Sequence, residues 1–266
     1  MQQRKVVLFT LGTRGDVEPF LAVAEILAER SFEVVCVFPE QFRPDVEMVG
    51  YRFYGFDAAF LELLLDQDGQ KILGGGGSPI SRLRSWIALA RKGMRLNRES
   101  DALQQEVLSA ESPDLVIRHP KCLFTVIWGM ANPGRSALLS PIPGAAHPVD
   151  DFGPVFTDHG KWLNRIEHGI VNIIKAVAIR SSAKKFKAEY PGIDLSISAI
   201  RNAIVRDERA AYTISPSLFP KPGGWPENAQ IVGYFERDKA ADWSAPADLE
   251  GFLQHHKKPI FISFGS

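Results

Sequence analysis

Apolar and polar positions along the first forty residues predict one strand–helix–strand unit. Val6 to Thr10 form a continuous apolar run, typical of a strand that is buried on both faces. From Pro19 to Arg30 the apolar side chains recur at helical spacing, and Phe32 to Phe38 is an apolar run again. A unit of this size is typical of a right-handed crossover between parallel strands.

Short apolar runs and helical stripes continue to alternate along the chain. Further strands are predicted at Tyr51–Tyr54, Asp114–Arg118, Ser136–Ser140, Ala211–Ser215, Gln230–Tyr234 and Ile260–Phe264. Helices are predicted at Gln41–Val49, Phe60–Leu73, Ile80–Ala110, Leu123–Ala131, Lys161–Tyr190 and Ala247–His256. This alternation predicts the α/β class, with a doubly wound parallel sheet of the Rossmann type.

The carboxyl-terminal residues have the pattern of a domain that is beginning. Pro259 to Ser266 combines a short apolar strand with a glycine turn, and a strand of this length is not stable alone. From Pro216 to Pro246 the chain is rich in Pro, Gly and Trp, which indicates an ordered segment that crosses between domains, and we expect residues 236–258 to be the linker. We therefore expect residues 1–235 to form one Rossmann-like domain and residues 259–266 to be the first strand of a second domain.

The charge and the cysteines limit the partners and the compartment. The 31 basic side chains equal the 31 acidic ones, so no overall field draws the chain to nucleic acid or to an anionic membrane. Cys36 and Cys122 both lie in apolar runs, which favours packed, reduced thiols over a disulfide or a metal site. The sequence shows neither an apolar run of membrane-spanning length nor a signal-peptide pattern. We expect a cytoplasmic protein without a nucleic-acid partner.

The loop between the first strand and the first helix carries the candidate chemistry. Its glycines, Gly12 and Gly15, are spaced G-x-x-G, whereas a dinucleotide-binding loop needs G-x-G-x-x-G. Asp16 stands at the amino end of the helix, where a pyrophosphate would otherwise bind, so this half is not expected to hold a nucleotide. Asp16 is then either a proton acceptor at the edge of the sheet or only a cap of its helix.

Two stretches of the chain resemble a known family. Gly12-Thr13-Arg14-Gly15-Asp16-Val17-Glu18-Pro19-Phe20 resembles the first-loop signature of the sterol 3-β-glucosyltransferases and of their bacterial relatives, which are GT-B glycosyltransferases of the family 28 type. The segment from Tyr212 to Pro222, Trp225 and the final stretch from Pro259 are similar to the interdomain segment of that family. Residues 56–210 agree with it only in pattern.

The resemblance implies an inverting hexosyltransferase. A nucleoside-diphosphate sugar, with UDP-glucose as the expected one, would give its hexose to a hydroxyl of a hydrophobic acceptor such as a sterol, a lipid or a polyketide. Asp16 would be the general base that deprotonates this hydroxyl. No metal ion and no cofactor is implied. The loop residues expected to bind substrate are Gly12, Thr13, Arg14 and Gly15.

The resemblance also divides the substrates between two domains. The donor would lie mainly on the second domain, with Gly265 and Ser266 as its contacts on this chain, so the chain alone is expected to be inactive. The acceptor would lie in a crevice bounded by the loops after residues 10, 118 and 140. We expect this crevice to be mostly apolar.

Two histidines are further candidates for the acceptor site. His119 follows a predicted strand and so lies at the same edge of the sheet as Asp16. It either contacts the acceptor or the base, or is a solvent-facing or capping residue. His147 lies in the long irregular segment 141–154, and in the related family the corresponding loop shapes the acceptor pocket.

The predicted helix from Lys161 to Tyr190 has an apolar stripe followed by a basic end. A helix that packs in the core, with a solvated basic end, is the favoured interpretation. The alternative is a helix that contacts a membrane surface. The stripe consists of Trp162, Leu163, Ile166, Ile170, Ile173, Ile174 and Val177.

Two other functions stay open. A UDP-sugar 2-epimerase has the same two-domain fold and a first loop that begins with Gly-Thr-Arg, but its loop lacks the residues Gly15-Asp16-Val17 that follow here. A binding module without catalytic activity is the second alternative.

Overall fold

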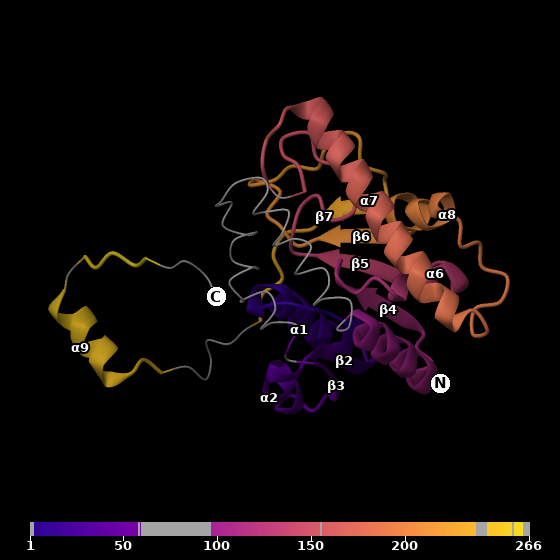
Figure 1. Ribbon diagram of the computed structural model, residues 1–266. Helices are drawn as coiled ribbons and strands as arrows, with labels where there is room; N and C mark the ends of the chain where they lie inside the picture. The colour runs from indigo at the N-terminus through magenta and orange to yellow at the C-terminus, as the bar shows by residue number, and fades with distance from the viewer. Residues whose placement is uncertain are drawn as a thin grey trace.

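A parallel sheet of seven strands is the centre of the molecule. The computed structural model describes residues 3–57, 59, 97–154, 156–237, 244–256 and 258–262. Within these residues the strands are arranged in the order β3-β2-β1-β4-β5-β6-β7 (Figure 1). The order reverses between β1 and β4, as a doubly wound sheet requires, so the predicted fold class is confirmed. The strands are β1 (Lys5–Phe9), β2 (Glu33–Pro39), β3 (Arg52–Phe56), β4 (Leu115–Arg118), β5 (Ser136–Ser140), β6 (Arg209–Tyr212) and β7 (Ala229–Ile231).

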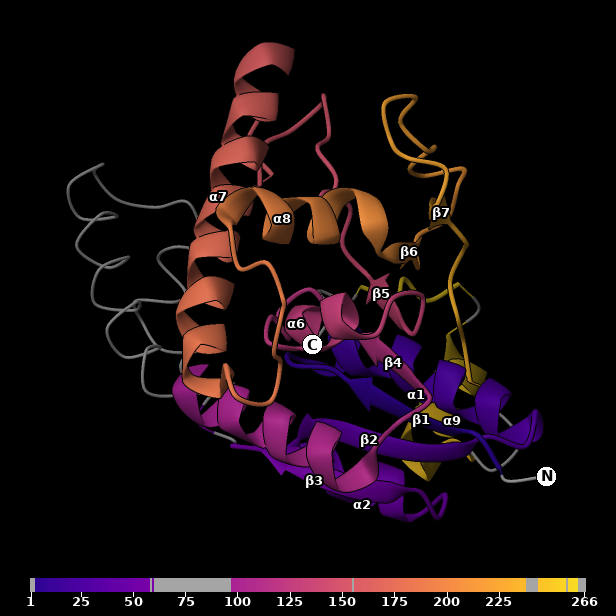
Figure 2. The same ribbon diagram turned by 90° about the vertical axis from the view of Figure 1, so that its right-hand side faces the viewer.

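Helices cover both faces of this sheet (Figures 1 and 2). Residues 97–111 are helical, and they run back along the sheet before β4. The other helical elements are α1 (Arg14–Glu29), η1 (Glu40–Phe42), α2 (Arg43–Glu47), α6 (Thr125–Ala131), α7 (Lys161–Ala183), η2 (Lys184–Phe186), α8 (Ile197–Asn202), the π-helical turn η3 (Ala203–Asp207) and α9 (Ala247–His255).

Alternate residues of β1 pack against opposite layers of helices. Val6 belongs to a buried cluster with Phe20 of α1, whereas Val7 belongs to a cluster with Val107 and Trp128 on the other face. This burial on two sides explains the unbroken apolar runs in the first two strands. The same packing buries the two cysteines as free thiols, which confirms that they form no disulfide.

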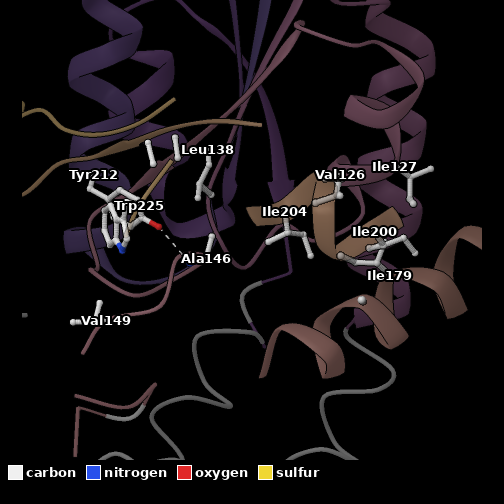
Figure 3. Packing of buried hydrophobic residues seen from close by; sticks show 14 of the residues in the cluster. Val126, Ile127, Leu138, Ala146, Val149, Ile179, Ile200, Ile204, Tyr212 and Trp225 are labelled. Carbon is white, nitrogen blue, oxygen red and sulfur yellow. Dashed lines mark hydrogen bonds between the residues drawn. The ribbon is translucent and has the colours of Figure 1, made fainter. Parts of the chain in front are cut away.

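A third cluster lies where α6, α7 and α8 meet β5 and β6. Figure 3 shows Tyr212 and Trp225 side by side, and their ring centroids are 4.5 Å apart. The Tyr212 hydroxyl accepts a hydrogen bond from the backbone N–H of Ala146 at 3.3 Å. The aromatic pair thereby fixes the loop after β5 to the end of β6.

α7 turns its apolar stripe towards solvent, so the prediction that this stripe packs in the core is wrong. The side chains of the stripe are between 38% and 73% exposed. The face of α7 that is buried instead carries Asn164, His168, Asn172, Ala176, Ile179 and Ala183.

Polar side chains on the buried face explain this orientation of α7. The Asn164 side chain donates a hydrogen bond to the carbonyl of Asp150 at 2.8 Å, and the Asn172 side chain donates to the carbonyl of Ala146 at 2.9 Å. Both carbonyls belong to the loop after β5. Because buried carbonyls need partners, the polar face of the helix packs on the loop and the apolar face is left outside.

A buried ion pair joins β4 to the start of β6. The Arg118 Nε lies 2.9 Å from Glu208 Oε1, and the two residues are only 2% and 9% exposed. Arg118 ends β4 and Glu208 immediately precedes β6, with β5 between these strands. The pair therefore ties the two sides of β5 together.

Several predicted elements differ from the structure. The helix predicted at 60–73 and most of the one predicted at 80–110 lie outside the described residues. α8 and η3 were not predicted. Ile260, Phe261 and Ile262 lie in no strand and are 87%, 91% and 71% exposed. An apolar run becomes a strand only beside a pairing strand, and none of the seven described strands pairs with these three residues.

Candidate active site

The loop after β1 holds Asp16 at the start of α1. Gly12 has a φ of +144°, and Thr13 is the residue before the helix. Asp16 Oδ2 accepts a hydrogen bond from the backbone N–H of Thr13 at 2.9 Å. This bond satisfies a backbone donor at the helix end, where the helix dipole also favours a negative charge. Asp16 therefore does cap α1, as one of the two interpretations predicted.

Two basic residues from the loop after β4 also contact the Asp16 carboxylate. His119 Nε2 lies 3.1 Å from Oδ1, and Lys121 Nζ lies 3.0 Å from Oδ2. β1 and β4 are adjacent in the sheet, so the loops that follow them meet. The prediction that His119 lies near Asp16 is confirmed.

The hydrogen bonds of His119 indicate its tautomer. Its Nδ1 accepts the backbone N–H of Lys121 at 3.3 Å, so a neutral ring carries its proton on Nε2, facing Asp16. The contact with Asp16 is close but not aligned as a regular hydrogen bond. Across the described part of the chain this buried nitrogen has no other partner.

The surroundings set the charges of this group. Asp16 is only 8% exposed, and burial alone would raise the pKa of its carboxyl, but His119 and Lys121 outweigh this effect and lower the pKa to about 2. Burial lowers the pKa of His119, against the opposite effect of Asp16. At neutral pH the group thus consists of a carboxylate, a neutral imidazole and an ammonium. The carboxylate is thus ionised, as a proton acceptor must be, but a pKa of about 2 makes it a weak base while His119 and Lys121 hold it.

Because Gly12 has no side chain, Asp16 and Lys121 have room to contact each other. A Cβ atom at residue 12 would lie 1.9 Å from Asp16 Oδ2 and 2.7 Å from Lys121 Nζ. The positive φ of Gly12 also disfavours any side chain there. A Cβ atom at Gly15 would have only Thr13 Oγ1, at 3.9 Å, within contact range. A side chain at residue 12 would therefore clash with the Asp16 group, whereas a methyl group at residue 15 would fit.

Arg14, the other expected substrate-binding residue of this loop, points away from Asp16. Its guanidinium contacts Glu18 Oε1 at 2.8 Å and Asp45 Oδ2 at 3.3 Å. Thr13 reaches Asp16 through its backbone. Of the expected loop residues, Gly12 and Thr13 therefore belong to the immediate surroundings of Asp16, and Arg14 links α1 to α2.

His147 is part of the core and is not brought to the Asp16 group. Its Nδ1 lies 2.8 Å from the Tyr212 hydroxyl and its Nε2 lies 2.9 Å from the carbonyl of Val205. The residue is fully buried. With both ring nitrogens bonded inside the protein, its surroundings do not support the predicted role of His147 in binding an acceptor.

Burial of His147 predicts a dependence of stability on pH. Burial lowers the pKa of His147 to about 4, below the usual value of 6.5. The unfolded chain therefore binds the proton first, and the free energy of unfolding should fall by about 1 kcal/mol per pH unit from this residue as the pH drops from 6 to 5. Denaturant unfolding of wild type and of His147→Gln at pH 7, 6 and 5 measures this effect. An equally steep fall in the variant would contradict it.

Lys121 was not among the residues predicted from the sequence. The signal that could have found it is its position: it follows His119 by two residues, after the strand beside β1. Gly265 and Ser266, the expected donor contacts, lie outside the described residues.

A cavity of about 420 Å³ borders Lys121. It lies between the helix 97–111, the residues 121–124 before α6, and the last turns of α7 with η2, rather than between the loops after residues 10 and 140. Its lining combines apolar side chains with charged ones, and its position differs from that of the expected crevice. The lining includes Arg98, Asp101, Lys121, Leu123, Ile179 and Lys185.

Among the described residues no cluster of three or more His, Cys, Asp or Glu side chains is placed to hold a metal ion. No helix in the described ranges is long and apolar enough to cross a membrane.

The fold resembles that of solved structures of the glycosyltransferase class. The glycotransferase of kitacinnamycin has a similar fold, with a TM-score of 0.53 at 14% identity over 93% of this chain and 56% of that one. The calicheamicin glycosyltransferase CalG4 has a TM-score of 0.50 at 16% identity over 88% of this chain and 52% of that one. Residues 6–92 match the N-terminal domain of glycosyltransferase family 28.

Curated relatives agree with this class. O-mycaminosyltylonolide 6-deoxyallosyltransferase of Streptomyces fradiae is 26% identical over 273 residues, which cover 98% of this chain and 61% of that protein. A sterol 3-beta-glucosyltransferase of Saccharomyces cerevisiae is 25% identical over 280 residues, which cover 98% of this chain and 22% of that protein. The chain thus spans less than two thirds of these relatives. The resemblance to family 28 and to the sterol glucosyltransferases is confirmed.

Proposed function

We propose that this chain is the acceptor-binding half of an inverting glycosyltransferase. The enzyme moves a hexose from a nucleoside-diphosphate sugar, with UDP-glucose as the first choice, to a hydroxyl of a hydrophobic acceptor such as a sterol, a lipid or a polyketide. The observation that carries this proposal is the ionised Asp16 carboxylate at the edge where the strand order reverses. The relatives, all named as glycosyltransferases, support it.

Asp16 acts as the general base in this proposal. The acceptor oxygen forms a bond to the anomeric carbon while the bond from that carbon to the diphosphate breaks, and the diphosphate leaves with the bonding electrons. The acceptor proton passes to Asp16. His119 and the Thr13 backbone hold the carboxylate in position. No metal ion and no cofactor takes part.

The donor lies mainly on a second domain, which follows residues 236–258. In this division residues 1–235 bind the acceptor, residues 259–266 begin the second domain, and Gly265 and Ser266 contact the donor. The chain alone then lacks half of the site, because the rate advantage of holding both reactants together is lost.

Gly12→Ala tests the geometry of the base. The added methyl group displaces the Asp16 carboxylate, so turnover of the complete enzyme should fall on the order of tenfold to a hundredfold. Gly15→Ala, in the same loop but with open space, is the matched control and should lower turnover much less than Gly12→Ala does. The measurement is kcat for both variants after circular dichroism has shown that they are folded. Equal rates for the two variants would contradict the role of Gly12.

We further propose that the enzyme works in the cytoplasm and touches a membrane through α7. The exposed apolar stripe supports this, as do Arg180 in the last turn of α7 and Lys184 and Lys187 just beyond it, which complement anionic headgroups.

Vesicle binding checks the membrane contact. The double variant Ile170→Glu/Ile174→Glu should bind vesicles of mixed phosphatidylcholine and phosphatidylglycerol at least about tenfold more weakly than wild type, because two apolar side chains no longer enter the lipid. Met48→Glu changes an even more exposed apolar residue away from α7 and should have no effect. Co-sedimentation measures both. The same loss in both variants, or wild type that stays in the supernatant, would contradict the contact.

A substrate screen tests the proposed function itself. The complete enzyme should form a glycoside when it is given UDP- or dTDP-sugars with sterols, polyketides and lipid alcohols. Conversion of the nucleotide sugar without any acceptor would favour the epimerase instead, and binding without turnover in every combination would favour a binding module.

A further inference from the structure

The cavity beside Lys121 has an amphipathic lining. Leu123, two residues before α6, and Ile179 of α7 give it an apolar wall. Arg98 and Lys185 bring positive charges to it from the helix 97–111 and from η2. A ligand that matches this lining has a hydrocarbon part and a polar group.

The charges of the cavity favour a negative ligand. Among the lining residues that the structure describes, Arg98, Lys121 and Lys185 are cations and Asp101 is the one acidic residue. The Asp101 carboxylate already accepts a hydrogen bond from the Ser182 hydroxyl, and burial raises the pKa of this carboxyl. A recess with an excess of one sign of charge raises the local concentration of the opposite ion.

Lys121 belongs both to the cavity and to the Asp16 group. Its ammonium has three N–H donors, and in the described part of the chain its one hydrogen-bond acceptor is Asp16 Oδ2. Oδ2 also accepts a hydrogen bond from the Thr13 N–H, so this oxygen already accepts two hydrogen bonds when Lys121 is in place. An anion in the cavity would compete with Asp16 for this ammonium and would leave the carboxylate more able to accept a proton.

We propose that this cavity receives the anionic oxygen group, a carboxylate or a phosphate, of an amphipathic acceptor, and that Lys121 is shared between this anion and Asp16. Arg98 and Lys185 are then specificity-determining residues, and Lys121 is a positioning residue. The coupling to Asp16 rests on the proposed transferase, whereas binding of the anion does not.

Calorimetric titration of the 266-residue chain tests the binding. The probes are decanoate, decyl phosphate, decanol and inorganic phosphate. Both anionic amphiphiles should bind at least about tenfold more tightly than decanol, the gain expected from one charge-assisted hydrogen bond. The tighter of the two identifies the oxygen group. Inorganic phosphate should bind weakly, because it lacks the apolar part.

Two double variants distinguish binding in the cavity from attraction to surface charge in general. Arg98→Gln/Lys185→Gln should bind the anionic amphiphiles about tenfold more weakly and decanol unchanged. Arg201→Gln/Arg206→Gln removes two exposed cations that do not line the cavity, and should bind like wild type. Decanol bound as tightly as decanoate, inorganic phosphate bound as tightly as decyl phosphate, or equal losses in the two double variants would overturn the proposal.

Turnover tests the sharing of Lys121. The complete wild-type enzyme should prefer an anionic over a neutral acceptor at least about tenfold in kcat/KM. Lys121→Met should lose this preference, and Lys121→Arg should keep most of it. An unchanged preference in Lys121→Met would overturn the coupling. Absence of all transfer by wild type would instead contradict the proposed function, while the binding result would stand.

Discussion

Asp16→Asn should lower turnover of the complete enzyme by roughly two to four orders of magnitude, the usual share of a positioned general base. The amide keeps the size of the side chain and an oxygen that can accept the Thr13 N–H, so the cap of α1 is retained. An amide cannot take the acceptor proton. Activity is measured as kcat and kcat/KM with saturating donor.

Two controls make this result specific. Asp45→Asn removes another carboxylate, which contacts Arg14 and not the Asp16 group, and should leave kcat close to wild type. Thermal unfolding of Asp16→Asn should show a single cooperative transition. Wild-type turnover in a folded Asp16→Asn variant would exclude Asp16 as the base.

Glu208→Gln should cost on the order of 3–5 kcal/mol of unfolding free energy, because it leaves the buried Arg118 guanidinium without its counter-charge. The substitution preserves shape, so the loss reports the charge and not a cavity. Denaturant unfolding at neutral pH measures it.

The exposed pair of Arg43 and Glu47 provides the matched control. Its atoms are 3.0 Å apart, and the two side chains are 41% and 54% exposed. Glu47→Gln should therefore cost less than about 1 kcal/mol. A cost for Glu208→Gln as small as that for Glu47→Gln would show that the buried pair adds no net stability.

The sequence predicted the sheet and the meeting of Asp16 with His119. Both followed from one rule, since residues after adjacent parallel strands gather at the edge where the strand order reverses. The apolar runs of β1 and β2 predicted strands because both faces of these strands are covered by helices. Lys121 was missed because no motif singles out a lysine whose partner is 105 residues away.

The stripe of α7 shows what periodicity leaves undetermined. It identified a helix and an apolar face correctly, but not what that face contacts. The loop after β5 required donors for its carbonyls, and Asn164 and Asn172 supplied them from the opposite face. His147 was misjudged for a related reason. Its position in an irregular loop suggested a binding residue, whereas its ring bonds Tyr212 and Val205 in the core.

The central claim is that Asp16 serves inverting transfer from a nucleotide sugar to an acceptor hydroxyl. The most direct test is carbon NMR of the reaction of the complete enzyme with UDP-glucose labelled at the anomeric carbon, with and without acceptor. We predict that the α-linked label appears in a β-glycoside, only when acceptor is present and only when residue 16 is aspartate. A glycoside that keeps the α configuration, or a label that changes without any acceptor, would contradict the account.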